Sequence, residues 1–365
     1  MGSNTIGKCF TVTYYGESHG RCIGVVIDGC PPGIPVSESD VQKELDKRKP
    51  TQDDVSTPRR EYDKVEILSG IFRNYTTGAP ISMLVWNKEF QSDVYKEFKW
   101  KPRPSHADYP SAIRYGGYAD YRGGGIFSGR ITIAFVAAGA VAKIILRRSG
   151  IEVLTHAVEV GGIEAKKSQS IKMIKKNVYA NPMRCADLKA ASEMEKTVRR
   201  AKDEKDSLGG IVECIVTGVP VGLGDPIFHS LDSDLAHFLF SIPAVKGIEF
   251  GVGFKAARLK GSENNDQYEI KNGKIVTKTN NAGGVLGGLS NGMPIVMRVA
   301  FKPPSSILQK QKTVDLRTMT ETELEIKGRY DVCVVPRAVP AVEAVVANIM
   351  ADHLLIFEGR AEKRG

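Results

Sequence analysis

Apolar and polar residues alternate in the N-terminal part of the chain, which is the period-two pattern of half-buried strands. Residues 9–15 (CFTVTYY) and 23–29 (IGVVIDG) follow this pattern, and Pro31, Pro32 and Gly33 end the second run. Two such runs in succession favour a β-hairpin. We therefore expect the chain to begin with two antiparallel strands.

Four later segments have the composition or the spacing of helices. Residues 37–47 start with a serine that suits an N-cap and carry acidic residues in their first turn. Residues 131–148 form an Ala- and Val-rich run typical of a buried helix. Residues 187–206 are highly charged and predict a helix with a solvated face, ahead of the strand pattern IVECIVTGVP. In residues 339–359 apolar side chains recur at helical spacing, and the glycine that ends this run is the predicted stop.

The order of these elements bears on the fold class. Strands and helices come in mixed order, and the first connections are those of hairpins, which favours an α+β architecture with antiparallel sheets over a doubly wound parallel sheet. The chain shows neither a low-complexity linker nor a convincing internal repeat. We therefore expect one domain over residues 1–365.

Composition is that of a globular protein with a sizeable core, at 42% hydrophobic and 25% charged residues over 365 positions. The N-terminus lacks the basic-then-apolar order of a secretory signal, so we expect a cytoplasmic protein. The longest apolar run carries Lys143 and is predicted to be core, with no membrane contact. Six cysteines form neither a CxxC pair nor a Cys/His cluster at zinc spacing, so we expect reduced thiols and no metal.

The formal net charge of +9 is compatible with two kinds of partner, a nucleic acid or an anionic small molecule. The basic residues are scattered, without the dense Lys/Arg tract and interleaved aromatic residues of a nucleic-acid surface. The pattern favours the small molecule and leaves nucleic acid as a rival.

The pentapeptide GESHG, residues 16–20, matches GxSxG, the nucleophile elbow of serine hydrolases, with Ser18 in the nucleophile position. An elbow needs a helix after the serine, whereas RCIGVVIDG, which follows Gly20, is strand-like. The hydrolase interpretation is therefore disfavoured. What remains is a glycine-flanked turn that presents His19, and a lone histidine in a turn is more often structural than catalytic.

A second candidate is RPSHADY, residues 103–109, followed by the glycine-rich YRGGGIFSGR, residues 121–130. Glycine-rich backbone that leads into a helix can bind an anion with its N–H groups, and this loop matches neither a dinucleotide nor an ATP pattern. Residues 302–306 (KPPSS) combine an ammonium group with hydroxyls, which suits a phosphate. A surface turn without a ligand could have the same sequence. Arg329 and Asp331 form either a simple ion pair or an anion-binding and proton-relaying pair.

Taken together and in this order, the motifs resemble those of the chorismate synthase family nearly from end to end. GESHG with IDG, RPSHADY leading to GGGIFSGR and AAGAVAK, and GRYDVCVVPRAVPAVEA look like its three main motifs. ILSGIFRNYTTGAPI, DSLGG, AVKGIEFG, GGVLGGLSNG and KPPSS fall between them in the family's order. The resemblance implies a β-α-β sandwich with antiparallel sheets around a helical core.

The resemblance also implies an activity and its partners. The family's reaction is a lyase reaction, the anti-1,4-elimination of phosphate from 5-enolpyruvylshikimate 3-phosphate, which gives chorismate at the last step of the shikimate pathway to aromatic amino acids. It uses reduced FMN without net redox change, and the family is usually a homotetramer. Whether NADPH or another reductant reduces the flavin stays open, because no dinucleotide motif is visible.

Residue roles follow from the resemblance alone. His106 would protonate the departing phosphate, His19 would manage a proton on the flavin, and Asp331 with Ser128 would assist proton movement. The other residues implied are the cofactor contacts Ser128, Ala244, Gly287, Lys302, Pro303, Pro304, Ser305, Ser306 and Arg329, and the substrate contacts Arg48, Arg103, Arg130 and Arg329.

Four positions depart from the family pattern. Ile126 and Phe127 replace a charged residue and a hydroxyl, Pro243 stands where an asparagine is common, and Asp54 stands where many members carry an arginine. Arg59 or Arg60 could supply the missing charge. A flavin-binding relative without activity is therefore a third alternative, beside a nucleic-acid-binding protein and a serine hydrolase.

Overall fold

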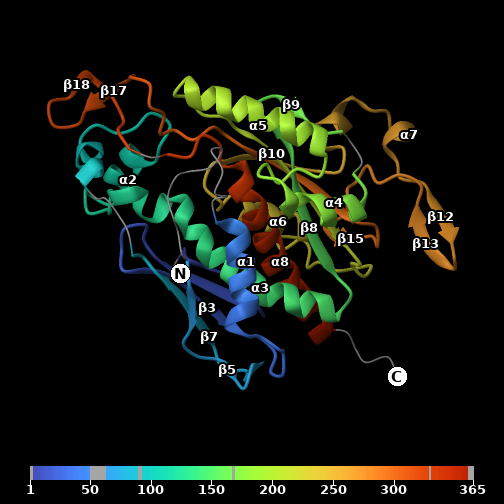
Figure 1. The fold of residues 1–365 in the computed structure, drawn as a ribbon. Coiled ribbons are helices and arrows are strands. Elements are labelled where there is room, and N and C mark those ends of the chain that lie inside the picture. Colours follow the sequence, from blue (N-terminus) through green and yellow to red (C-terminus); the bar gives the residue numbers. More distant parts are fainter. Residues whose placement is uncertain (1–2, 50–62, 89–92, 167–168, 329, 361–365) are drawn as a thin grey trace.

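The computed structural model describes residues 3–49, 63–88, 93–166, 169–328 and 330–360. Figure 1 shows two antiparallel sheets with helices packed between them. This arrangement confirms the α+β fold class expected from the sequence. The expectation of a single domain stays a prediction, although most buried apolar side chains of the described residues belong to one contiguous core.

The first sheet has the strand order β1-β2-β3-β7-β4, and all of its pairs are antiparallel. Its strands are β1 (Thr5–Ile6), β2 (Thr11–Gly16), β3 (Cys22–Asp28), β7 (Ile81–Trp86) and β4 (Val65–Ile67). Thr11 pairs with Asp28 and Gly16 with Ile23, so β2 and β3 form the predicted N-terminal hairpin. The turn between them carries the GESHG motif.

The second sheet has the order β11-β16-β10-β8-β9 and is also antiparallel. Its strands are β11 (Val245–Phe250), β16 (Ile295–Phe301), β10 (Gly210–Thr217), β8 (Glu152–Val160) and β9 (Ile163–Glu164). The predicted strand IVECIVTG is thus the central one. Along β16 the side chains alternate between buried and half-buried, as expected of a strand with one face on the core.

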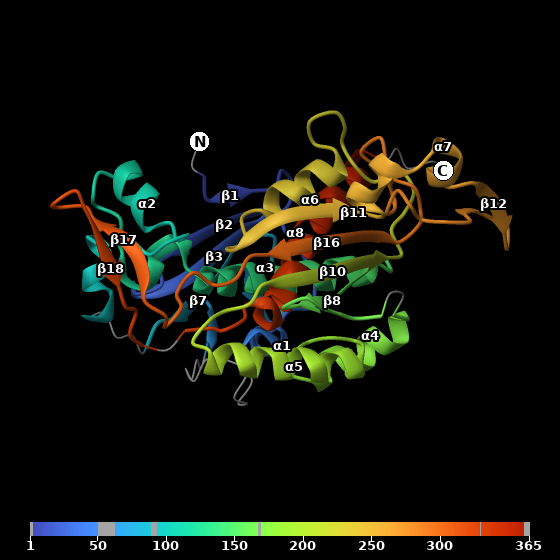
Figure 2. The ribbon, with the colours of Figure 1, turned by 90° about the horizontal axis from the view of Figure 1, so that it is seen from above.

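The layer between the sheets is built on α3 (Thr132–Arg148) and α8 (Val335–Arg360), which pack against each other. Helix α3 lies on the first sheet and α8 on the second, while α1 (Glu38–Arg48) and α6 (Leu231–Leu239) pack beside them (Figure 2). By length and composition α3 with the turn before it, and α8, are apolar enough to cross a membrane, but they are 78% and 94% buried within the fold. Their apolar character is that of core helices.

Smaller elements complete the chain outside this layer. The highly charged α5 (Leu188–Asp203) lies beside β9, with Asp187 as its N-cap. The remaining elements are β5 (Ile71–Phe72), β6 (Tyr75–Thr76), β12 (Tyr268–Lys271), β13 (Lys274–Thr277), β14 (Val285–Leu286), β15 (Leu289–Ser290), β17 (Gln311–Asp315), β18 (Thr320–Leu324), α2 (Asp108–Arg114), α4 (Ile171–Asn177), α7 (Gly261–Asn264) and the 3₁₀ segments η1 (Asp93–Lys99), η2 (Arg122–Phe127), η3 (Gly129–Ile131), η4 (Val178–Ala180) and η5 (Gly253–Arg258).

A local sequence signal explains the start of α1, but not the end of α8. The Ser37 hydroxyl accepts a hydrogen bond from the Asp40 N–H and the Asp40 carboxylate accepts one from the Ser37 N–H, which is the predicted start of α1. The predicted stop of the C-terminal helix at Gly359 is wrong, because α8 continues through it to Arg360. A glycine in an open last turn costs a helix only about 1 kcal/mol relative to alanine, which the buried remainder of α8 outweighs.

Candidate active site

One cavity of about 570 Å³ collects the sequence motifs. This volume lies in the range typical of small-molecule sites. Its walls come from the end of α1, the loop before α2, the glycine-rich loop, the segment after α6, the segment after β16 and the start of α8. The sequence-predicted residues that line it are Arg48, His106, Ser128, Arg130, Ala244, Lys302, Pro303, Pro304, Ser305, Ser306 and Asp331.

The glycine-rich loop, η2, packs against both histidine motifs. Gly123, Gly124 and Gly125 all have positive φ, which glycine adopts without strain. A Cβ on Gly123 would lie 2.4 Å from the His19 ring, and one on Gly124 would lie 3.4 Å from Cε1 and Nε2 of His106. Gly123 therefore leaves room for the His19 ring and Gly124 packs beside His106, while Gly125 packs on the backbone of Asp120.

His106 lies in a compact cluster of charged residues at the N-terminal end of α2. Its Nδ1 is 2.6 Å from Oδ1 of Asp108, and the guanidinium of Arg103 grips both carboxylate oxygens of Asp108 at 2.8 Å. Burial lowers the pKa of His106 from its ordinary value, the hydrogen bond that its ring donates to Asp108 opposes that shift, and the positive charges of Arg103 and Lys302 add to it. The neutral imidazole is thus favoured in the free protein.

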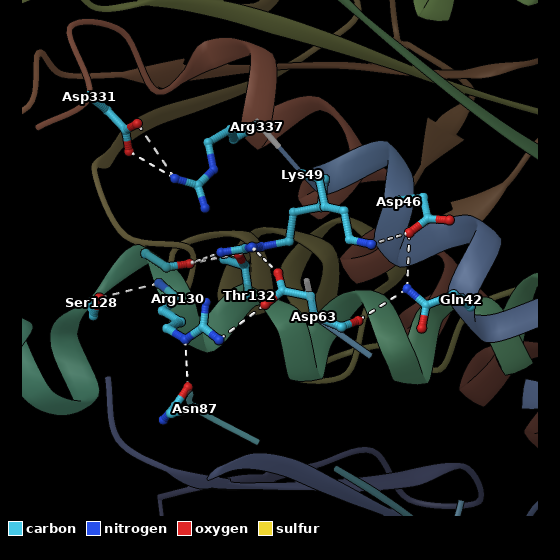
Figure 3. A network of polar contacts seen from close by, with 12 residues as sticks. Gln42, Asp46, Lys49, Asp63, Asn87, Ser128, Arg130, Thr132, Asp331 and Arg337 are labelled. Carbon is cyan, nitrogen blue, oxygen red and sulfur yellow. Dashed lines mark hydrogen bonds and ion pairs between the residues drawn. The ribbon is translucent and has the colours of Figure 1, made fainter. Parts of the chain in front are cut away.

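Arg48 and Arg130 line one side of the cavity, its floor, and share a buried carboxylate, Asp63. Figure 3 shows Asp63 beside Arg130. Nη1 of Arg48 is 3.3 Å from Oδ2 of Asp63, and Nη2 of Arg130 is 3.0 Å from Oδ1. Arg48 also donates from Nε to the Thr132 hydroxyl, and its side chain is 1% exposed. Arg130 donates from Nε to Asn87, whose amide donates to two carbonyls of the GESHG turn. This network links the end of α1, the glycine-rich loop and the GESHG turn.

Two lysines stand at the other wall. Lys302 donates from Nζ to the carbonyl of Ser105, next to His106, and Lys246 also lines the cavity. Partial burial lowers the pKa of Lys302 from its ordinary value, and the charge of Lys246 lowers it further. The Ser306 hydroxyl accepts a hydrogen bond from Nη1 of Arg103 at 3.0 Å. The positive charges of Lys302 and Lys246 on one cavity favour the binding of an anion beside them.

Asp331 pairs with Arg337 on the first turn of α8, with Nη1 of Arg337 3.1 Å from Oδ2 of Asp331 (Figure 3). Both residues line the cavity. The sequence motifs did not indicate a role for Arg337, nor for Asp63, Asp108 and Lys246. A charged residue at the start of an otherwise apolar helix was the available signal for Arg337.

Some predicted site residues do not line this cavity. His19 is 5% exposed and lies behind η2, against the ring of Tyr95, and Arg103 lies behind His106. Gly287 lies in the β14–β15 turn; its neighbour Gly288 packs on Ser230 at the start of α6, whereas the cavity begins at the end of α6. Arg329, Asp54, Arg59 and Arg60 lie outside the described residues.

The departures found in the sequence do face the cavity. Ile126, Phe127 and Pro243 all line it, so apolar surface stands where the family pattern has polar groups. Among the described residues no group of three or more His, Cys, Asp or Glu side chains is placed to hold a metal ion.

Comparison with known proteins assigns the family. The family model described as chorismate synthase matches residues 10–355. A chorismate synthase of Methanosarcina barkeri is 55% identical over 97% of both chains, and one of Dehalococcoides mccartyi is 52% identical over 97% of both. A solved structure, "Crystal Structure of Chorismate Synthase", superposes with a TM-score of 0.75 at 29% identity and covers 96% of this chain and 92% of its own. The chain therefore belongs to the chorismate synthase family.

Proposed function

We propose that this chain, by its family a lyase of the shikimate pathway, removes phosphate and a ring hydrogen from 5-enolpyruvylshikimate 3-phosphate by anti-1,4-elimination to give chorismate. The observation that carries the proposal is the convergence of an imidazole, a carboxylate and several cations on one cavity. The site residues come from segments between Arg48 and Arg337, far apart along the chain. A surface turn or an isolated ion pair would not bring them together.

The charge of the cavity suits this substrate. Two carboxylates and a phosphate give the substrate a charge of roughly −4, which a partly dry site must balance. The basic residues that line the cavity are Arg48, Arg130, Arg337, Lys246 and Lys302. Asp63 already occupies part of Arg48 and Arg130. We therefore propose Arg130, with Arg337 and the lysines, as the main substrate contacts, while Arg48 holds the floor; Arg329 stays a proposal from the resemblance.

The residues present also fit FMN. Ile242, Phe301 and Val334 give the cavity apolar wall for a ring system, and the 302–306 turn offers an ammonium group and hydroxyls for a phosphate. We propose that Ser128, Ala244 and residues 302–306 hold the cofactor; Gly287 is left out because it does not line the cavity. Bound in its reduced form, FMN would supply electron density to the breaking C–O bond and recover it afterwards.

Proton movement falls to residues of the chain. We propose that His106 gives a proton to the departing phosphate, and that Asp331 with the Ser128 hydroxyl moves a proton at the opposite wall. Asp331 already has an acceptor role toward Arg337. His19 reaches the cavity only through η2, so its proposed role on the flavin depends on how that loop is held.

An anaerobic assay with photoreduced FMN, in which chorismate and phosphate are measured together, tests the proposal. We expect both products in equal amounts, and none with oxidised FMN. Folded, flavin-loaded protein that forms no chorismate would overturn the assignment and leave a binding protein. Salt-sensitive retention of DNA without affinity for FMN would instead support the nucleic-acid rival. The hydrolase alternative already meets an obstacle, because Ser18 is buried.

We also propose a cytoplasmic homotetramer that contacts neither nucleic acid nor membrane, with NADPH as one candidate reductant. Several large apolar side chains stand exposed on the β12–β13 hairpin and on the loop before α6. They are Ile227, Phe228, Ile270 and Ile275. Apolar surface of this kind suits contact with other copies. Light scattering should give the mass of four 39.8-kDa chains, and a monomer would contradict this expectation.

A further inference from the structure

Asp108 is a buried carboxylate to which the proposed reaction gives no role. Its side chain is 4% exposed and belongs to the first residue of α2. It accepts hydrogen bonds from Nε, Nη2 and the backbone N–H of Arg103 at 2.8, 2.8 and 3.0 Å. The fourth close contact is Nδ1 of His106 at 2.6 Å. All four contacts hold the carboxylate between an arginine and the proposed acid.

These contacts keep Asp108 ionised. Burial alone would raise the pKa of the Asp108 carboxyl, but the hydrogen bonds from Arg103 and His106 outweigh burial and hold the pKa well below its ordinary value. An ionised carboxylate has no proton to donate, so the short contact to His106 is a hydrogen bond only if Nδ1 carries the proton. Arg103 Nη2, 3.1 Å from the same Nδ1, cannot accept that proton and acts by its charge.

The other ring nitrogen of His106, Nε2, takes part in no hydrogen bond among the described residues, whereas Nδ1 is engaged by Asp108 and Arg103. His106 lines the cavity, and Gly124 of η2 packs beside its Cε1 and Nε2 edge. The charged groups that act on the ring are Asp108 and Arg103 from its own loop and Lys302 from the segment after β16. Nε2 is therefore the nitrogen free to exchange a proton with a ligand.

We propose that Asp108, locked by Arg103, is a positioning residue that fixes the proton of His106 on Nδ1 and leaves Nε2 to serve the reaction. This inference rests on the proposed function. As the C–O bond breaks, its electron pair leaves with the phosphate, the proton on Nε2 passes to a phosphate oxygen, and His106 becomes neutral. Arg103 is then part of the support for His106 and not a substrate contact, which its engaged guanidinium explains.

The substitution Asp108→Asn tests this role by kinetics. We expect kcat near neutral pH to fall by about 10²- to 10⁴-fold, with a much smaller change in KM, because orientation and charge support are lost while the substrate contacts remain. A general acid must be protonated, and loss of the carboxylate lowers its pKa. The alkaline fall of kcat should therefore move to lower pH, and activity should partly return in acid.

Asp315→Asn is the matched control. Asp315 is also buried and accepts hydrogen bonds from Nε and Nη2 of Arg317 at 3.1 and 2.7 Å. Unlike the contacts of Asp108, these two do not include a histidine. This variant loses the same kind of ion pair and should keep the wild-type kcat and pH profile. If Asp108→Asn keeps both as well, the positioning role is wrong. If its KM rises while kcat holds, Asp108 and Arg103 serve substrate binding instead, which also overturns the inference.

A second measurement reads the wild-type protein directly and needs no turnover. In protein with ¹⁵N-labelled histidine, the nitrogen shifts of the ring show which nitrogen of neutral His106 bears the proton. His106→Gln assigns the signal among the six histidines. We expect the proton on Nδ1, and a proton on Nε2 in the neutral ring would refute the inference. This result stands apart from the assay, so failure of the proposed elimination and failure of the Asp108 role are distinguishable.

Discussion

His106 and His19 both contact the glycine-rich loop, but only His106 lines the cavity. We predict that His106→Ala lowers kcat by about 10²- to 10⁴-fold and leaves the dissociation constant of FMN near the wild-type value, because a proton donor is lost without a change in the cofactor contacts. His19→Ala should also lower turnover. His237→Ala, at an exposed position on α6, is the control. Full activity in both variants would show that the proton-transfer roles are wrong.

The environment of His106 predicts a pH effect. Burial first, then Arg103 and Lys302, lower its pKa in the free protein, whereas a substrate of roughly −4 bound beside it favours the protonated ring. An acid loses activity as the pH rises through its pKa. The alkaline fall should therefore occur at lower pH in kcat/KM, which reports the free enzyme, than in kcat, which reports the complex. Steady-state kinetics across pH measure both, and coincident profiles would contradict the prediction.

The sequence could predict residues whose chemistry is visible within one motif, such as His106, Arg130 and the lysine of KPPSS. It could not predict Asp63, which serves as counter-ion to two arginines from distant segments. Gly287 does not line the cavity, and its contact with the cofactor stays a prediction. Whether a residue reaches a site depends on how elements that are remote in sequence pack together. The residues next to it in the chain do not indicate that packing.

At the scale of elements, α3 and α8 touch backbone to backbone at Gly139. A Cβ there would lie 2.4 Å from Cβ and 2.6 Å from Cα of Ala344. Gly139→Ala should therefore destabilise the protein by about 1–3 kcal/mol through overpacking, despite the better helix propensity of alanine. Urea unfolding measures the change. Gly359→Ala, in the open last turn of α8, should instead be neutral or stabilising. Equal effects of the two variants would show that the helices do not meet this closely.

The same helices bury a lysine, Lys143, between Glu44 of α1 and Glu343 of α8. Its Nζ is 2.7 Å from Oε2 of Glu44, one turn before Arg48 at the cavity floor. Lys143→Met should cost about 3–5 kcal/mol in unfolding free energy, because two buried carboxylates lose their partner. Lys196→Met, which removes an exposed pair with Glu193, should cost at most about 1 kcal/mol. A loss in Lys143→Met no larger than this would contradict the prediction.

Element types followed well from the sequence, while their arrangement did not. Periodicity and the Ser37 cap predicted α1, α3, α8 and the first hairpin, since those signals are local. The order of the second sheet places β16 between β10 and β11, although the three strands are far apart in sequence. The packing around this sheet is also long-range, since α8 contacts β8 and β10 while α6 contacts β11.

At the scale of the whole molecule, two sheets and a helical layer hold six segments around one cavity. The resemblance to the family predicted the site residues from their motifs, without their positions in space. The fold explains why the set is dispersed: the arginines of α1 and the α3 entry form a floor, and the lysine turn and α8 form the facing walls. A rigid scaffold of this kind suits a polyanionic substrate, whose charge must be met from several directions.

The proposed reaction is a flavin-dependent elimination without net redox change. The most direct test adds excess 5-enolpyruvylshikimate 3-phosphate to the protein with a limiting amount of reduced FMN, strictly without oxygen or further reductant. We predict many chorismate molecules for each reduced flavin, each with one phosphate, and flavin that is still reduced at the end. Product that stops at one per flavin, or flavin that ends oxidised, would contradict it.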